Sequence, residues 1–177
     1  MLFRSEVLAG VAALGRVRRR ADGLTSPEEL TLDRLRSDPD FEGVSNAGPH
    51  APKFEKWINR GGTVELMPEG HFRYSADIDL LGQPQRISVE YPDGYPDFRP
   101  FMTHPSGVRA VEIDVSGDPK IDRLRANAAA GRTDWDSMPP TGWTWHHVED
   151  ARTMQLVPSV INQRFGHQGG ASIARNR

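Results

Sequence analysis

The chain has 177 residues, of which 37% are hydrophobic and none is cysteine, and its formal net charge is −2. This length and composition are typical of one globular domain with a short appendage, and they allow a packed core. Without cysteine, disulfides and thiolate zinc sites are excluded, so any metal ligand must be His, Asn, Asp or Glu. No apolar run reaches the roughly eighteen residues of a membrane span, which predicts no transmembrane helix.

The N-terminal part is expected to be helical. Apolar residues recur at helical spacing from Leu2 to Arg20, and the arginines follow this apolar stretch, whereas in a signal peptide they would precede it. We therefore expect no signal peptide and a helix that packs on a protein surface. The sequence Ser26-Pro27-Glu28-Glu29 resembles a capping box with proline at the first helical position, which predicts a second helix to about Ser37.

The middle of the chain alternates loops and strands. Asp38-Pro39-Asp40 should end the second helix, and residues 41–52 have the Gly, Pro, Ser and Asn content of a loop in which His50 is exposed. Polar and apolar residues then alternate, which predicts an antiparallel meander with a fourth strand and an Ala-rich helix after it. The expected strands are 63–67, 71–80, 85–91 and 108–115, and the expected helix is 119–130. The predicted domains are residues 1–60, a helical appendage with a linker, and residues 61–177.

Two adjacent histidines, His146 and His147, stand at the end of a short aromatic run that is expected to form a strand. Neutral imidazole is both a metal ligand and a general base near pH 7. Successive residues of a strand point to opposite faces, so these two side chains should not both bind one ion. One can hold a metal while the other activates water, and strand alternation does not decide which does which.

The residues that follow carry a family resemblance. Trp145-His146-His147 is followed by Glu149-Asp150, Met154-Gln155-Leu156-Val157-Pro158 and His167-Gln168-Gly169-Gly170. This series resembles the WHH branch of the HNH/endonuclease VII nuclease superfamily, and the resemblance extends from about Asp93 to the C-terminus. It implies an α+β fold with N-terminal helices, an antiparallel β meander and a C-terminal ββα-metal (HNH) core at about residues 141–172.

The resemblance also implies roles for the polar residues. His146 is the metal ligand, His147 is the general base, and Asn162 occupies the place where this branch commonly has a helix-borne histidine ligand. An amide oxygen favours Mg²⁺ or Mn²⁺ as the single divalent ion, with Zn²⁺ or Ni²⁺ as alternatives. His167 is expected to be a third ligand or a phosphate contact, with a surface histidine as the other interpretation. The alternative for the whole motif is that Asn162, in place of a histidine ligand, leaves a metal site that is weakened or lost.

Further residues are assigned around this motif. Gln155 precedes Leu156-Val157-Pro158, where related nucleases have an asparagine that braces the base, and Asp150 is expected to orient His147 or to border the metal water. Glu149 is equally well explained as a solvated turn residue, and Trp143 and Trp145 should pack beneath the hairpin. The expected phosphate contacts are arginines, whose forked donors suit phosphate. They are Arg123, Arg125, Arg152 and Arg164.

The resemblance implies a metal-dependent DNase that is the toxic effector of a bacterial competition system. Its implied partners are DNA, an acidic immunity protein and a secretion-system carrier, with no membrane partner. Such a protein is made in the bacterial cytoplasm and delivered into the cytoplasm of a target cell. The alternatives are a phage or mobile-element HNH endonuclease and a catalytically silent nucleic-acid-binding module. Net charge does not discriminate among them, because residues 101–177 carry 9 basic and 8 acidic side chains.

Overall fold

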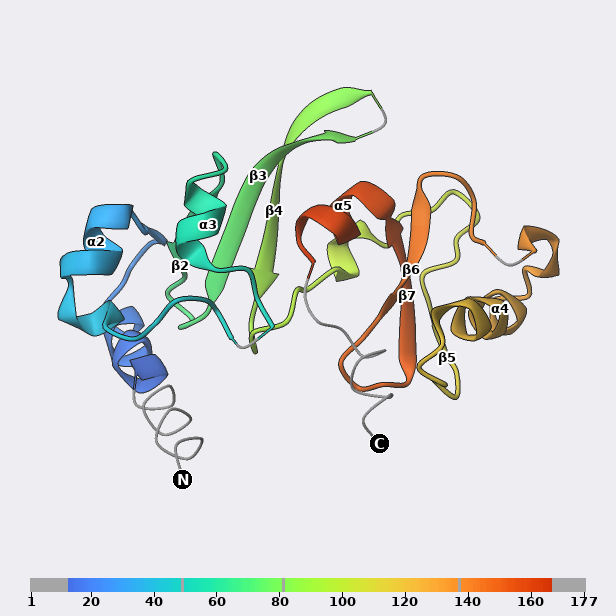
Figure 1. The fold of residues 1–177 in the computed structure, drawn as a ribbon, viewed down its shortest axis with the longest axis horizontal. Coiled ribbons are helices and arrows are strands. Elements are labelled where there is room, and N and C mark those ends of the chain that lie inside the picture. The colour runs from blue at the N-terminus through green and yellow to red at the C-terminus, as the bar shows by residue number, and fades with distance from the viewer. Residues whose placement is uncertain (1–12, 49, 81, 137, 167–177) are drawn as a thin grey trace. The chain divides into compact units, whose positions relative to one another are not determined.

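The structure is a computed structural model that describes residues 13–48, 50–80, 82–136 and 138–166. The chain forms two compact units: unit 1 comprises Met1–Asp77 with Gln85–Pro96, and unit 2 comprises Ile78–Pro84 with Asp97–Arg177. Both contain helices and antiparallel strands, which confirms the α+β class (Figure 1). The predicted domain boundary at residue 60 stays a prediction. Within the described ranges, no helix has the length and apolar content needed to cross a bilayer.

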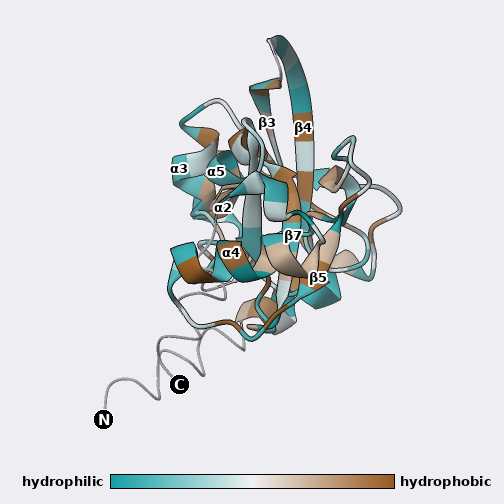
Figure 2. Cartoon of the chain, turned by 90° about the vertical axis from the view of Figure 1, so that its right-hand side faces the viewer, coloured by the Kyte–Doolittle hydropathy of each residue, from teal (hydrophilic) through white to brown (hydrophobic). Residues whose placement is uncertain are grey.

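Unit 1 contains the predicted meander apart from Ile78–Pro84, which belongs to unit 2. The strands β1 (Glu28–Glu29), β2 (Thr63–Leu66), β3 (Phe72–Leu80) and β4 (Gln83–Tyr91) form one sheet in the order β1-β2-β3-β4. The sheet core is aromatic, because the fully buried Tyr74 ring lies 4.7 Å from the Tyr91 ring and 5.3 Å from the Trp57 ring, measured between centroids. The first residues of β4 are exposed, and Figure 2 shows this end of the β3–β4 hairpin as largely hydrophilic.

The second predicted helix begins later than the capping box indicated. The helix α2 (Leu32–Ser37) is capped by Thr31, whose side chain accepts a hydrogen bond from the Arg34 backbone N–H, and it ends at Asp38 as expected. Glu28 instead lies in β1, because its backbone pairs with Leu66 and its carboxylate binds Arg20 and Arg34. A tertiary ion pair and a sheet ladder therefore override the local capping signal. The first helix is described only over residues 13–21, so its predicted start lies outside the described residues.

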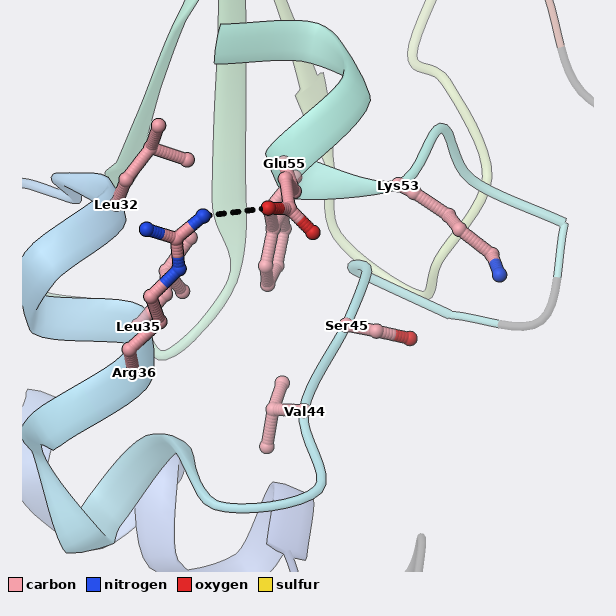
Figure 3. Close-up of a pocket in the computed structure, with 8 residues that line it drawn as sticks. Leu32, Leu35, Arg36, Val44, Ser45, Lys53 and Glu55 are labelled. Carbon is pink, nitrogen blue, oxygen red and sulfur yellow. Dashed lines mark hydrogen bonds and ion pairs between the residues drawn. The ribbon is translucent and has the colours of Figure 1, made fainter. Parts of the chain in front are cut away.

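The expected loop is confirmed over residues 42–48 and 50–52, with the short 3-10 helix η1 (Pro39–Phe41) before it and the helix α3 (Phe54–Ile58) after it. His50 is half-buried rather than exposed, and its ring stacks on Tyr95 at 5.3 Å. Between α2 and α3 lies a pocket of about 250 Å³. Figure 3 shows Arg36 and Glu55 bridging this pocket, 2.7 Å apart, and both side chains are more than half exposed. Such an exposed pair contributes little to stability.

Unit 2 contains the motif. Its three-stranded sheet has the order β5-β7-β6, with β5 (Ala110–Glu112), β6 (Trp143–His147) and β7 (Thr153–Pro158) all antiparallel. The Ala-rich helix α4 (Pro119–Ala129) forms as predicted and lies beside β5 (Figure 1). The short helix α5 (Ser159–Arg164) follows β7 directly, and two 3-10 helices, η2 (Arg99–Phe101) and η3 (Thr133–Trp135), complete the unit. The predicted fourth strand is shorter than expected, since its ladder to β7 covers only Ala110–Glu112.

Candidate active site

The motif folds as a hairpin followed by a helix. In the β6–β7 register His146 lies opposite Gln155, and His147 lies opposite Met154. The helix α5 is held by Ile161, which is fully buried, and by the hydrogen bond from the Ser159 N–H to the Gly142 carbonyl at 2.8 Å. The strand–turn–strand–helix order is the ββα arrangement that the resemblance implies.

The two histidines point to opposite faces of β6, as strand alternation requires. Trp145 and His147 contact α4, because the Trp145 indole N–H donates to Asn127 Oδ1 at 2.7 Å and His147 Nε2 lies 3.0 Å from Asp122 Oδ2. His146 contacts α5 on the other face. Trp145 belongs to a buried cluster with Ala126, Met154 and Leu156, against which Trp143 packs, so the expected packing of both tryptophans is confirmed.

His146 lies beside Asn162, as the predicted ligand pair requires. Its Nδ1 is 2.9 Å from Asn162 Oδ1, its ring meets the Phe98 ring edge-on at 4.8 Å, and only 5% of the residue is exposed. Two donors that share one small divalent ion at adjacent octahedral positions lie about 3 Å apart, so this spacing fits a shared ion. Imidazole and amide donors also suit such an ion. Within the described residues no group of three or more His, Cys, Asp or Glu could hold a metal, and His167 lies outside them.

His147 lies against a carboxylate that the sequence analysis did not assign. Asp122 is fully buried in the first turns of α4, and it also accepts hydrogen bonds from the Ser116 N–H, the Ser116 hydroxyl and the Gly117 N–H. Burial alone would raise the pKa of Asp122, but the hydrogen bonds from Ser116 and His147 outweigh it and lower that pKa. Asp122 is therefore an ionised acceptor at neutral pH. No local pattern marks it, since it lies 25 positions before His147 in the chain.

The other predicted catalytic residues are placed differently. Asp150 accepts hydrogen bonds from the Arg152 and Thr153 backbone N–H groups and from the Thr153 hydroxyl, so its carboxylate organises the hairpin turn. Burial raises its pKa, but the Thr153 and Arg152 hydrogen bonds produce a net lowering. Among the described hydrogen bonds, the carboxylate that contacts His147 belongs to Asp122. Gln155 lies on the same face as His146, directly opposite it, and Glu149 is exposed.

The four predicted phosphate-binding arginines are spread over unit 2. Arg125 on α4 donates to the Asp114 carbonyl, and Arg152 in the hairpin turn pairs with Glu112 at 2.8 Å. Arg123 is half-buried on α4, and Arg164 is half-buried in the last turn of α5. Arg125 and Arg152 therefore already have a carbonyl or acidic acceptor, which reduces the charge that they offer to phosphate.

The comparisons with known proteins concern the segment that carries the motif. Residues 136–177, about a quarter of the chain, match a family described as a nuclease of the HNH/ENDO VII superfamily with conserved WHH. Nucleases of this superfamily generally use a divalent metal. Comparison with curated proteins gives no match. The resemblance over residues 93–135 stays a prediction. Residues 136–177, which include Trp145-His146-His147, match the WHH nuclease family of the HNH/ENDO VII superfamily.

Proposed function

We propose that this chain is a divalent-metal-dependent endonuclease that hydrolyses DNA, and that it acts as a toxic effector of a bacterial competition system. The observation that carries the proposal is the pairing of His146 with Asn162 on one face of β6 and of His147 with Asp122 on the other. These pairs lie within or beside the segment that matches the nuclease family. Asn162 beside His146 suits metal binding, and Asp122 beside His147 suits proton transfer.

In the proposed mechanism, His146 and Asn162 would hold a divalent metal, and His147 takes the proton of the attacking water. Both histidines stand at the C-terminal end of β6, which is where the phosphate would bind in this proposal. A divalent ion held by these residues would supply Lewis-acid stabilisation of charge on the phosphate and on the leaving oxygen. His147 supplies general-base catalysis, and its side chain is 12% exposed, which leaves a path for water.

Plasmid cleavage tests this proposal. Supercoiled DNA incubated with the purified chain and Mg²⁺, Mn²⁺, Zn²⁺ or Ni²⁺ should become nicked and then linear, and excess chelator should stop the reaction. RNA is treated in parallel, because both nucleic acids offer the same phosphodiester to the site. Cleavage of RNA alone contradicts the DNA assignment, and lack of cleavage of either substrate with all four metals contradicts the nuclease.

The effector role predicts an inhibitor. A nuclease with weak sequence preference damages the cell that makes it, so we propose that an acidic immunity protein covers its basic residues, and that a secretion-system carrier delivers it. The pairing of Arg152 with Glu112 illustrates the attraction of such arginines for carboxylates. Expression of the chain in a bacterial cytoplasm should stop growth, and co-expression of the neighbouring gene should restore it.

The control for this growth experiment is His147→Ala, which should remove the toxicity without removing the protein. Colony counts at matched expression levels, checked on immunoblots, measure the effect. Normal growth of cells that contain folded, cleavage-competent wild-type chain contradicts the toxin role and leaves the nuclease activity standing.

A further inference from the structure

The buried carboxylate of Asp122 is held in place from several directions. Oδ1 accepts the Ser116 N–H and the Ser116 hydroxyl, both at 2.7 Å, and Oδ2 accepts the Gly117 N–H at 3.2 Å. Its backbone N–H donates to the Asp118 carbonyl at 2.9 Å, within the first turn of α4. The loop before α4 and the helix itself therefore determine where this carboxylate lies.

His147 Nε2, at 3.0 Å, is the fourth group on this carboxylate. An ionised carboxylate accepts hydrogen bonds and donates none, so Nε2 must carry the proton in this contact. In neutral imidazole the other nitrogen then has the free lone pair. The contact with Asp122 thus selects one of the two tautomers of His147.

We propose that Asp122 is a positioning residue that holds His147 in its Nε2–H tautomer, so that Nδ1 takes the proton of the attacking water. This inference rests on the proposed nuclease function. The water proton passes to Nδ1 while the water oxygen bonds to phosphorus. The P–O bond that breaks leaves its electron pair on the departing oxygen, which takes a proton from bulk water.

A second contact from α4 keeps β6 in position for this arrangement. Asn127 Oδ1 accepts the Trp145 indole N–H at 2.7 Å, and Asn127 Nδ2 donates to the Asp136 carbonyl at 3.1 Å. Asn127 and Trp145 are 2% and 4% exposed, so the contact is shielded from water. Trp145 and His147 lie on the same face of β6, and both contact α4. The helix therefore restrains the strand at both residues and with it the position of the His147 ring.

The test is Asp122→Asn with Asp118→Asn as its matched control. An amide at position 122 can turn its NH₂ group toward Nε2, which moves the imidazole proton to Nδ1 and blocks the base. The turnover number should then fall by up to about 10⁴-fold, as for a histidine base held in the wrong tautomer, while KM changes little. Asp118 lies on the same helix and caps its N-terminus, so Asp118→Asn removes the same charge without touching His147. It should leave turnover unchanged.

Nitrogen-15 NMR of the histidine rings provides a readout that does not depend on cleavage. In its neutral form, wild-type His147 should show a protonated Nε2 and a bare Nδ1. Asp122→Asn should reverse this pattern, and Asp118→Asn should keep it. If Asp122→Asn does not fold, the wild-type spectrum decides by itself.

A wild-type spectrum with Nδ1–H, or undiminished turnover in Asp122→Asn, overturns the proposal while leaving the nuclease function intact. If the wild-type chain cleaves neither DNA nor RNA, the nuclease function fails. The spectra then still support or overturn the assignment of the tautomer to Asp122.

Discussion

Replacing His147 by alanine is expected to lower the rate of DNA cleavage by about 10² to 10⁴-fold, which is the usual contribution of a general base. Metal affinity should be nearly unchanged, because the ring faces Asp122 and α4, whereas the proposed ligands His146 and Asn162 face α5. Single-turnover cleavage at saturating metal measures the effect, and calorimetric titration measures the affinity.

The matched control is His104→Ala, which makes the same chemical change in unit 2. His104 packs against the rings of Trp135 and Trp143 and has no role in the proposed mechanism. This variant should cleave at a rate close to that of the wild type. Normal turnover of His147→Ala, at the same metal occupancy, would show that another group activates the water.

The second large effect is expected on the opposite face of β6. His146→Ala should lose both metal binding and cleavage, and cleavage should recover partly at high metal concentration. The physical reason is that the variant removes one of the two proposed donors, His146 Nδ1 and Asn162 Oδ1, which lie 2.9 Å apart. Calorimetry with Mn²⁺ and cleavage rates against metal concentration measure the two effects.

Asn162 provides the complementary variants. Asn162→Ala should raise the metal concentration needed for cleavage, and Asn162→His should keep activity while shifting the preference toward Zn²⁺ or Ni²⁺, for which imidazole is the better donor. Gln163→Ala is the control, because Gln163 is the next residue of α5 and is exposed. Unchanged metal dependence in both Asn162 variants would place Asn162 outside the ligand set.

Local patterns in the sequence determined several features of the protein. Residue alternation located the meander strands, and the Ala-rich stretch of residues 119–130 located α4. The ordered motif after Trp145 located the β6–β7–α5 unit and the family match. These features are readable because a strand, a cap or a motif depends on neighbours within a few positions. The opposite orientations of His146 and His147 also follow from strand geometry alone.

Only the tertiary structure decided which residues far apart in the sequence contact one another. The helix start expected from the capping box at Ser26 does not form, because Glu28 instead pairs with a neighbouring strand and forms an ion pair with Arg20. A short window of sequence around Ser26 does not show these contacts. The carboxylate that contacts His147 is that of Asp122 in α4. The carboxylate of Asp150, which is closer in the sequence, instead accepts hydrogen bonds within its own turn. A carboxylate becomes a positioning group only when the fold buries it, supplies its donors and brings a distant histidine to its free lone pair. These three conditions are set by packing between segments far apart in the sequence.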